Sequence, residues 1–153
     1  MHRRSAFLIV LFLLAILIGG CRGEQPEKWK EITFEHLFSN PEKHNRDNIT
    51  LEGFYFGRWE VIVIAESLDY SGYAEGHLVP NGRMIWMEGG IPGEVYNQLY
   101  QQQMMGPTER YGKVRVSGKF EYGGKYGHLG AYTYQITPSR VELLQWSPPI
   151  EQQ

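Results

Sequence analysis

The stretch that decides the fold is KVRVSGKFEY, residues 113–122. Along it, Val114, Val116 and Phe120 alternate with charged or polar neighbours. A β-strand that buries one face and exposes the other has this period of two, because successive side chains point to opposite faces. We therefore predict a half-buried strand over residues 113–122, followed by a turn at Gly123-Gly124.

Four further strands are predicted on either side of this stretch. Residues 49–56 alternate in the same way, residues 61–64 (VIVI) are a run of β-branched side chains, and residues 84–87 form a third short apolar stretch. Towards the C-terminus, residues 131–136 and 141–144 form a last extended segment with a bend at the proline between them. The strand signals are short and closely spaced, which is typical of an all-β domain.

Glycine and proline residues set the expected ends of these strands. Gly53 is predicted to mark a bulge or a tight bend inside the first strand, and Gly57 to end it. Residues 67–83 are rich in Gly, Ser, Asn and Asp, and we expect them to form a long loop that ends in a turn at Pro80-Asn81-Gly82.

Two helices are predicted in addition to the strands. Residues 33–38 have Thr33 as an N-cap and an apolar face, and Asn40-Pro41 should end this helix. Residues 92–104 begin with a proline, carry an apolar stripe and are followed by Gly106-Pro107. A helix over 92–104 would lie between the third and the fourth strand.

The predicted fold class is all-β with minor helix. Five short strands, a glycine inside the first and a helix between the third and the fourth match an OB-fold, a small Greek-key barrel. We expect a closed, antiparallel, OB-like barrel over residues 32–147, with a frayed tail over residues 148–153. A domain of about 115 residues is large enough to bury one such core without disulfides.

The N-terminus has the composition of a secretory signal peptide. Two arginines precede an apolar run of thirteen residues, 6–18, and small residues follow. A helix that spans a bilayer needs about 20 apolar residues, so the run is short for a permanent membrane helix. An uncleaved anchor and an ordinary signal peptide are the alternatives to the interpretation that follows.

The end of this run, Ile18-Gly19-Gly20-Cys21, resembles the lipobox of bacterial lipoproteins. The resemblance implies cleavage after Gly20, diacylglyceryl attachment to the Cys21 thiol and N-acylation of the new terminus, for instance with palmitate. Cys21 is the only cysteine of the chain, so no intrachain disulfide can form. Residues 1–20 would then be a signal peptide, and residues 21–31 a lipidated tether.

Three stretches of the remaining chain resemble small bacterial OB-fold proteins. Residues 34–53 read F-x-x-L-x-x-N-P-x-x-H-N-x-x-x-I-x-L-x-G, residues 113–120 read KVRVSGKF, and residues 127–132 read GHLGAY. The resemblance covers most of residues 32–146. It implies a fold, but no activity and no catalytic residue.

Charge and export limit the class of partner. Removal of residues 1–20 leaves 13 basic against 17 acidic residues, a net charge of −4. An acidic domain is poorly suited to neutralise phosphates, so we expect no nucleic acid partner.

The expected location is a cell membrane, which the protein reaches by export and to which the lipid anchors it. In a bacterium with two membranes, Arg22 after the cysteine favours the periplasmic side of the outer membrane, because aspartate there often retains lipoproteins in the inner membrane. The oligomeric state is left open.

Aromatic and histidine side chains near two predicted turns form a candidate ligand rim. In OB-folds the connections between strands one and two and between strands four and five flank the ligand face. The alternative is a purely structural role, in which the glycines allow the backbone to turn and the aromatic rings pack in the core. The candidate rim residues are Trp59, Tyr126, His128, Tyr132 and Tyr134.

No metal, cofactor or catalytic constellation is predicted. The four histidines after the signal peptide are far apart in sequence, without the spacing of metal ligands. Their positions are 36, 44, 77 and 128.

The leading hypothesis is a non-enzymatic, membrane-tethered binding or interaction module of the cell envelope, with a protein or a glycan as partner. One alternative is a small hydrolase-like enzyme that uses the acidic 66–88 region, with carboxylates at positions 66, 69, 75 and 88. The other is a binder of glycans or small ligands through exposed barrel aromatics.

Overall fold

The computed structural model describes residues 29–104 and 106–150. It is mainly β-sheet with few helical residues, which confirms the predicted all-β class with minor helix. No helix in these two ranges is long and apolar enough to span a membrane. In chain order the elements are β1 (Lys30–Glu31), α2 (Phe34–Ser39), the 3₁₀-helix η1 (Pro41–His44), β2 (Asn48–Arg58), β3 (Val61–Tyr70), β4 (Leu78–Met87), α3 (Gly93–Tyr96), β5 (Tyr100–Gln102), β6 (Glu109–Tyr126), the 3₁₀-helix η2 (His128–Gly130) and β7 (Tyr132–Leu143).

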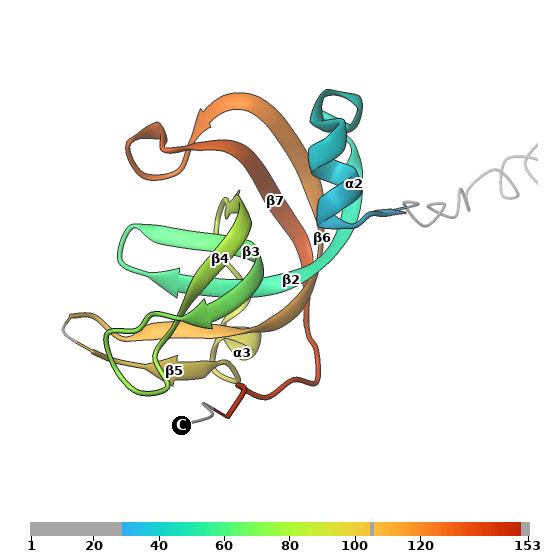
Figure 1. The fold of residues 1–153 in the computed structure, drawn as a ribbon. Coiled ribbons are helices and arrows are strands. Elements are labelled where there is room, and N and C mark those ends of the chain that lie inside the picture. Colours follow the sequence, from blue (N-terminus) through green and yellow to red (C-terminus); the bar gives the residue numbers. More distant parts are fainter. Residues whose placement is uncertain (1–28, 105, 151–153) are drawn as a thin grey trace, which may run out of the picture.

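The strands form one curled sheet (Figure 1). Its order is β1-β2-β3-β4-β7-β6-β5, and β2 also pairs with β6, so that β2, β3, β4, β7 and β6 form a closed circuit of pairings. The sheet differs from the prediction in two respects: it has seven strands, and it is mixed. β1 pairs with β2 in parallel, and β4 pairs with β7 in parallel. Strands of two or three residues leave no period in a sequence, which explains why β1 and β5 were not predicted.

The helix α2 forms as predicted. The Thr33 hydroxyl accepts a hydrogen bond from the backbone N–H of His36 at 3.2 Å, which satisfies one of the free donors of the first turn. Phe34 and Leu37 are buried, and the Phe38 ring lies 4.3 Å from that of Tyr134. The helix therefore covers part of the larger apolar core of the sheet (Figure 1).

The core has two clusters, which lie on opposite faces of β2. Tyr55 belongs to the larger cluster and its neighbour Phe56 to the smaller, and both are buried. In the larger cluster, Val114, Val116 and Phe120 of β6 are completely buried, so the alternation that predicted this strand is confirmed. Burial also raises the pKa of Tyr55 to about 12, so this phenol stays neutral at physiological pH.

The predicted loop over residues 67–83 is wrong. β3 continues to Tyr70 and β4 begins at Leu78, so that Pro80-Asn81-Gly82 lies inside β4. A shift of register between Ala65 and Ser67 accommodates the irregular stretch. Proline is tolerated in β4 because the pairing with β7 involves only the end of the strand, at Trp86 and Met87.

The predicted helix over residues 92–104 is also wrong, since α3 ends at Tyr96. Tyr100–Gln102 pair instead with Glu109–Tyr111 as a hairpin, and Gly106-Pro107 lies in its connection. Buried Val95 and Leu99 supply only one apolar turn. A helix so short gains little from packing, whereas pairing with the edge of β6 satisfies backbone groups.

Two predictions about glycines are wrong as well, and the bulge that was one of two expectations for Gly53 is absent from the pairing of β2 with β6. Gly57 lies within β2, and Gly123-Gly124 lie within β6 at a shift of register rather than in a turn. Gly53 marks no bulge, because β2 and β6 pair without interruption from Asn48 to Gly57. A Cβ atom on Gly53 would lie 2.8 Å from Ala65 O, Ile64 Cγ1 and Phe34 Cε2. The residue is glycine because β3 and α2 pack directly on its backbone.

We predict that Gly53→Ala destabilises the fold by roughly 1–3 kcal/mol, because the added methyl group overpacks this contact. Urea unfolding of the full chain measures the difference. Gly93→Ala is the matched control, since a Cβ atom there meets nothing within 4 Å. Equal unfolding midpoints for the two variants would contradict the proposed close approach.

Candidate functional site

Four connections between strands surround an open pocket of about 690 Å³. They are the β2–β3 turn, the β3–β4 loop, the β5–β6 hairpin and the β6–β7 loop. In Figure 1 all four lie on the left of the molecule, whereas β1 lies on the right. The pocket is lined by Arg58, Trp59, Glu60, Val61, Tyr73, His77, Val79, Met104, Gly106, Pro107, Glu109, His128, Ala131 and Tyr132.

The structure brings three of the five candidate rim residues together. Trp59, His128 and Tyr132 line this pocket, although 69 residues separate the first two in sequence. Burial raises the pKa of the Tyr132 phenol, and the nearby Arg58 opposes this shift.

The other two candidate rim residues lie elsewhere. Tyr134 stacks on Tyr122 at 5.4 Å and contacts Phe38 and Phe120, and therefore packs against the larger core cluster. Tyr126 stands opposite Tyr132 in the pairing of β6 with β7, with its ring over Gly124, outside the pocket lining. For Tyr134 the structural role that we weighed against ligand binding is the one observed.

A hydrogen-bonded group of side chains forms the floor of the pocket. The Nε2 atom of His77 lies 2.9 Å from Oε2 of Glu109, and both side chains are buried. Gln102 donates to the same carboxylate oxygen at 2.8 Å, and Arg58 Nη1 lies 3.5 Å from Oε1. Because a carboxylate only accepts, the His77 imidazole carries a proton on Nε2. The Nδ1 atom of His77 lies 2.8 Å from the Ser71 hydroxyl.

Reasoning from the sequence missed this group. His77 and Glu109 are 32 residues apart; His77 lay in the acidic 66–88 region without being named there as a site residue, and Glu109 lay in no candidate stretch. A contact between two connections leaves no periodic signal in the sequence, so only the fold reveals the pair.

Two exposed aromatic rings stand at the mouth of the pocket. Trp59 in the β2–β3 turn is 73% exposed, and Tyr73 in the β3–β4 loop is 83% exposed. Leu129, next to His128 in η2, is 91% exposed and has a positive φ of 54°. Large apolar side chains that stay in water are uncommon on a monomer when they gather at one place, and such a gathering marks an interaction site.

The carboxylates of the acidic 66–88 region lie outside the pocket lining, although Tyr73, His77 and Val79 of the same region belong to it. Glu66 binds Arg83 through both carboxylate oxygens, at 2.7 and 2.9 Å, and this hydrogen bonding lowers the pKa of Glu66. Asp69 accepts from the backbone N–H of Tyr70, and Glu88 accepts from the indole N–H of Trp86. These three carboxylates therefore have separate partners, and none of them lines the pocket.

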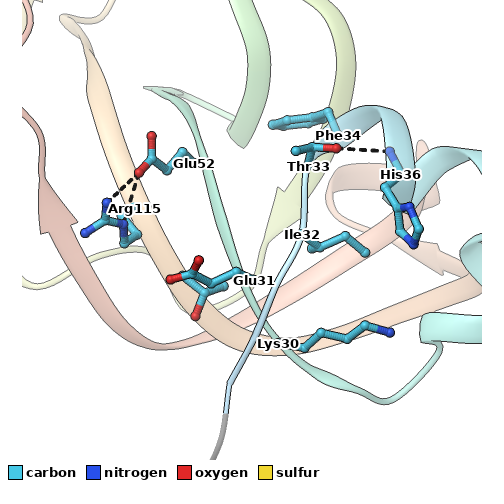
Figure 2. Close-up of a pocket in the computed structure, with 9 residues that line it drawn as sticks. Lys30, Glu31, Ile32, Thr33, Phe34, His36, Glu52 and Arg115 are labelled. Atoms are coloured by element: carbon cyan, nitrogen blue, oxygen red, sulfur yellow. Dashed lines mark hydrogen bonds and ion pairs between the residues drawn. The ribbon is translucent and has the colours of Figure 1, made fainter.

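A second groove, of about 560 Å³, lies beside β1 (Figure 2). Three of its charged side chains have partners: Arg115 donates to Glu52 at 2.6 Å, and Lys30 donates to the buried His44 Nδ1 at 3.2 Å. Its lining residues are Lys30, Glu31, Ile32, Thr33, Phe34, His36, Thr50, Glu52 and Arg115.

Two further expectations concern the whole chain. Cys21, the predicted lipidation site, lies outside the described residues. Within the described ranges, no group of three or more His, Cys, Asp or Glu side chains is placed to hold a metal ion.

We predict that His77→Leu destabilises the fold by about 3 kcal/mol, because a buried carboxylate loses a donor. In a double-mutant cycle with Glu109→Gln, the two side chains should show a coupling energy of about 1–3 kcal/mol, measured by urea unfolding. Glu52→Gln breaks the exposed pair with Arg115 and should cost less than about 1 kcal/mol. Wild-type stability of His77→Leu would rule out this role of the pair.

Comparisons of the chain with protein-family models, with curated proteins and with solved structures gave no match. The chemistry of the pocket is therefore inferred from its own residues.

Proposed function

We propose that the mature chain is a lipid-anchored, non-enzymatic ligand-binding module of the bacterial cell envelope. The pocket between the four connections is its ligand site, and Cys21 is its anchor. The observation that carries the proposal is the position of the pocket, with exposed aromatic rings above a fixed polar floor. Two of the connections that form it are the β2–β3 turn and the β6–β7 loop.

An OB-like barrel is the architecture that we assign to the circuit of strands. β2, β3, β4, β6 and β7 are then its five strands in chain order, and β1 and β5 are additions at its edges. The position of α3 between the third and the fourth strand supports this assignment. In such a barrel the β2–β3 turn and the β6–β7 loop are the connections that flank the ligand face. The pocket lies between them.

Binding rather than catalysis is favoured by the state of the polar groups. Ser71, His77 and Glu109 are the residue types of a hydrolytic triad, in hydrogen-bonding sequence. However, Ser71 is not among the residues that line the pocket, and its hydroxyl already accepts the backbone N–H of Tyr73 at 3.2 Å. We assign these side chains the task of holding the β3–β4 loop against the start of β6.

The position of β1 supports a pocket that faces away from the membrane. β1 forms the last two residues of the proposed tether and lies on the side of the barrel opposite the four connections (Figure 1). A lipid attached at Cys21 would therefore leave the mouth of the pocket open towards envelope ligands.

The anchor is tested by mass spectrometry of membrane-extracted protein. We expect the N-terminal peptide to begin at Cys21 and to carry acyl chains, because two or more chains are needed for stable attachment. Cys21→Ala should remain unprocessed at Gly20 and lack this modification. Recovery of an unmodified Cys21 peptide from the membrane would exclude lipidation.

The site is tested by affinity capture from envelope extracts with the lipidated chain as bait. We expect one component to be retained by the wild type and lost by a Trp59→Ala/His128→Ala variant, since both side chains line the pocket. Tyr96→Ala is the control, because Tyr96 is an exposed aromatic residue outside the pocket lining. Equal retention by all three proteins, or turnover of a retained small molecule, would overturn the proposal.

A further inference from the structure

The geometry points to a neutral oligosaccharide as the ligand of this pocket. This inference rests on the proposed function, because it names the chemical class that the same site accepts. Four properties of the pocket support it: separate exposed aromatic platforms, a preorganised pair of charged groups, a net charge that disfavours anions, and a volume typical of small-ligand sites.

The platforms are Trp59 and Tyr73, which come from two different connections. Both lie in the pocket lining, and both keep most of their surface in water. The C–H face of a pyranose ring packs on an aromatic ring, and stacking on aromatic side chains is a recurrent mode of binding planar or flat ligands. Two platforms on separate connections suit a chain of sugar rings better than a single small molecule.

The Arg58 guanidinium and the Glu109 carboxylate, which also line the pocket, offer hydrogen bonds of opposite kind. The Oε2 atom of Glu109 is held by His77 and Gln102, whereas Oε1 has only the 3.5 Å ion pair with Arg58 among its contacts in the described chain. The Arg58 side chain is 52% exposed. An acceptor and a fork of donors at this separation fit adjacent hydroxyl groups of a sugar. Because the carboxylate is already fixed, little conformational entropy is lost when it binds.

The charge of the pocket selects against anions. Its lining contains one arginine and two carboxylates, Glu60 and Glu109, so its net charge is −1 when His77 and His128 are neutral. The mature chain would itself carry −4. An anionic polymer, such as a nucleic acid or a polyuronate, would meet repulsion, whereas a neutral saccharide would not.

The size of the pocket favours a small ligand over a folded protein. Its volume of about 690 Å³ lies in the range of about 300–1,000 Å³ that is typical of small-ligand sites. A stable protein interface buries about 800 Å² on each partner around an apolar centre. Here the lining includes the buried polar pair of Glu109 and His77 beside apolar side chains.

The test measures binding of neutral oligosaccharides to the mature, lipidated chain in lipid nanodiscs, which avoid detergents with sugar headgroups. An array of neutral oligosaccharides is screened first, and hits are measured by titration calorimetry beside cellotetraose, tetra-N-acetylchitotetraose and an anionic tetragalacturonate. We expect at least one neutral oligosaccharide to bind with a Kd between micromolar and low millimolar, and the tetragalacturonate to bind at least tenfold more weakly.

Variants assign the binding to the pocket. Trp59→Ala should weaken the Kd about tenfold or more, because a stacking platform is lost, and Trp59→Phe should recover part of the loss. Tyr73→Ala should also weaken binding, whereas Tyr96→Ala should leave it unchanged. These side chains are exposed, so the substitutions should not unfold the protein, and circular dichroism checks this.

The outcomes separate this inference from the proposed function. Binding of no neutral oligosaccharide, binding that is indifferent to Trp59, or tighter binding of the tetragalacturonate overturns the saccharide assignment. If the capture experiment then still retains a protein or a peptide in a Trp59-dependent manner, the pocket is a binding site for another class of ligand and the proposed function stands. Failure of both experiments overturns both.

Discussion

Ten consecutive residue pairs join β2 to β6, from Asn48 with Lys119 to Gly57 with Arg110, and the rest of the sheet depends on them. Because β2 also pairs with β3, this second partner closes the circuit of strands and leaves β2 without a free edge. Closure brings the β2–β3 turn to the same side as the β5–β6 hairpin. It also demands a backbone without a side chain at Gly53, where β3 and α2 pack.

One buried carboxylate, that of Glu109, links the closed circuit of strands to the connections around the pocket. Glu109 begins β6, and its carboxylate contacts the β3–β4 loop through His77, β5 through Gln102 and the end of β2 through Arg58. Hydrogen bonds in a buried environment are strong, and a group that lost them would be costly. The contacts of the Glu109 carboxylate therefore hold the connections around the pocket in place. By contrast, the ion pairs of Arg115 and Arg83 are partly exposed and lie outside this pocket.

The structural features that the sequence predicted correctly are those that show a periodic pattern or depend on neighbouring residues. The alternation of β6, the start of β2 and the Thr33 cap each depend on neighbouring residues, and each is present. The end of β3, the start of β4 and the pairing of Tyr100–Gln102 depend on partners far along the chain, so local composition misassigned them as loop or helix. The site divides in the same way. Trp59, His128 and Tyr132 were predicted as site residues from the sequence. The pair of His77 and Glu109 could be identified only from the folded structure.

The separation of the paired strands also governs how the chain must fold. Asn48 and Lys119 are 71 residues apart, and the remaining pairs of β2 with β6 are of similar range. Contacts of such high order are formed slowly, because a long loop must be closed before they stabilise anything. Every nascent chain emerges N-terminus first. One edge of β2 therefore stays unpaired, and its apolar face stays exposed to water, until β6 has also emerged. During this interval the protein is most exposed to aggregation, and a chaperone that holds unfolded chains would act on it then.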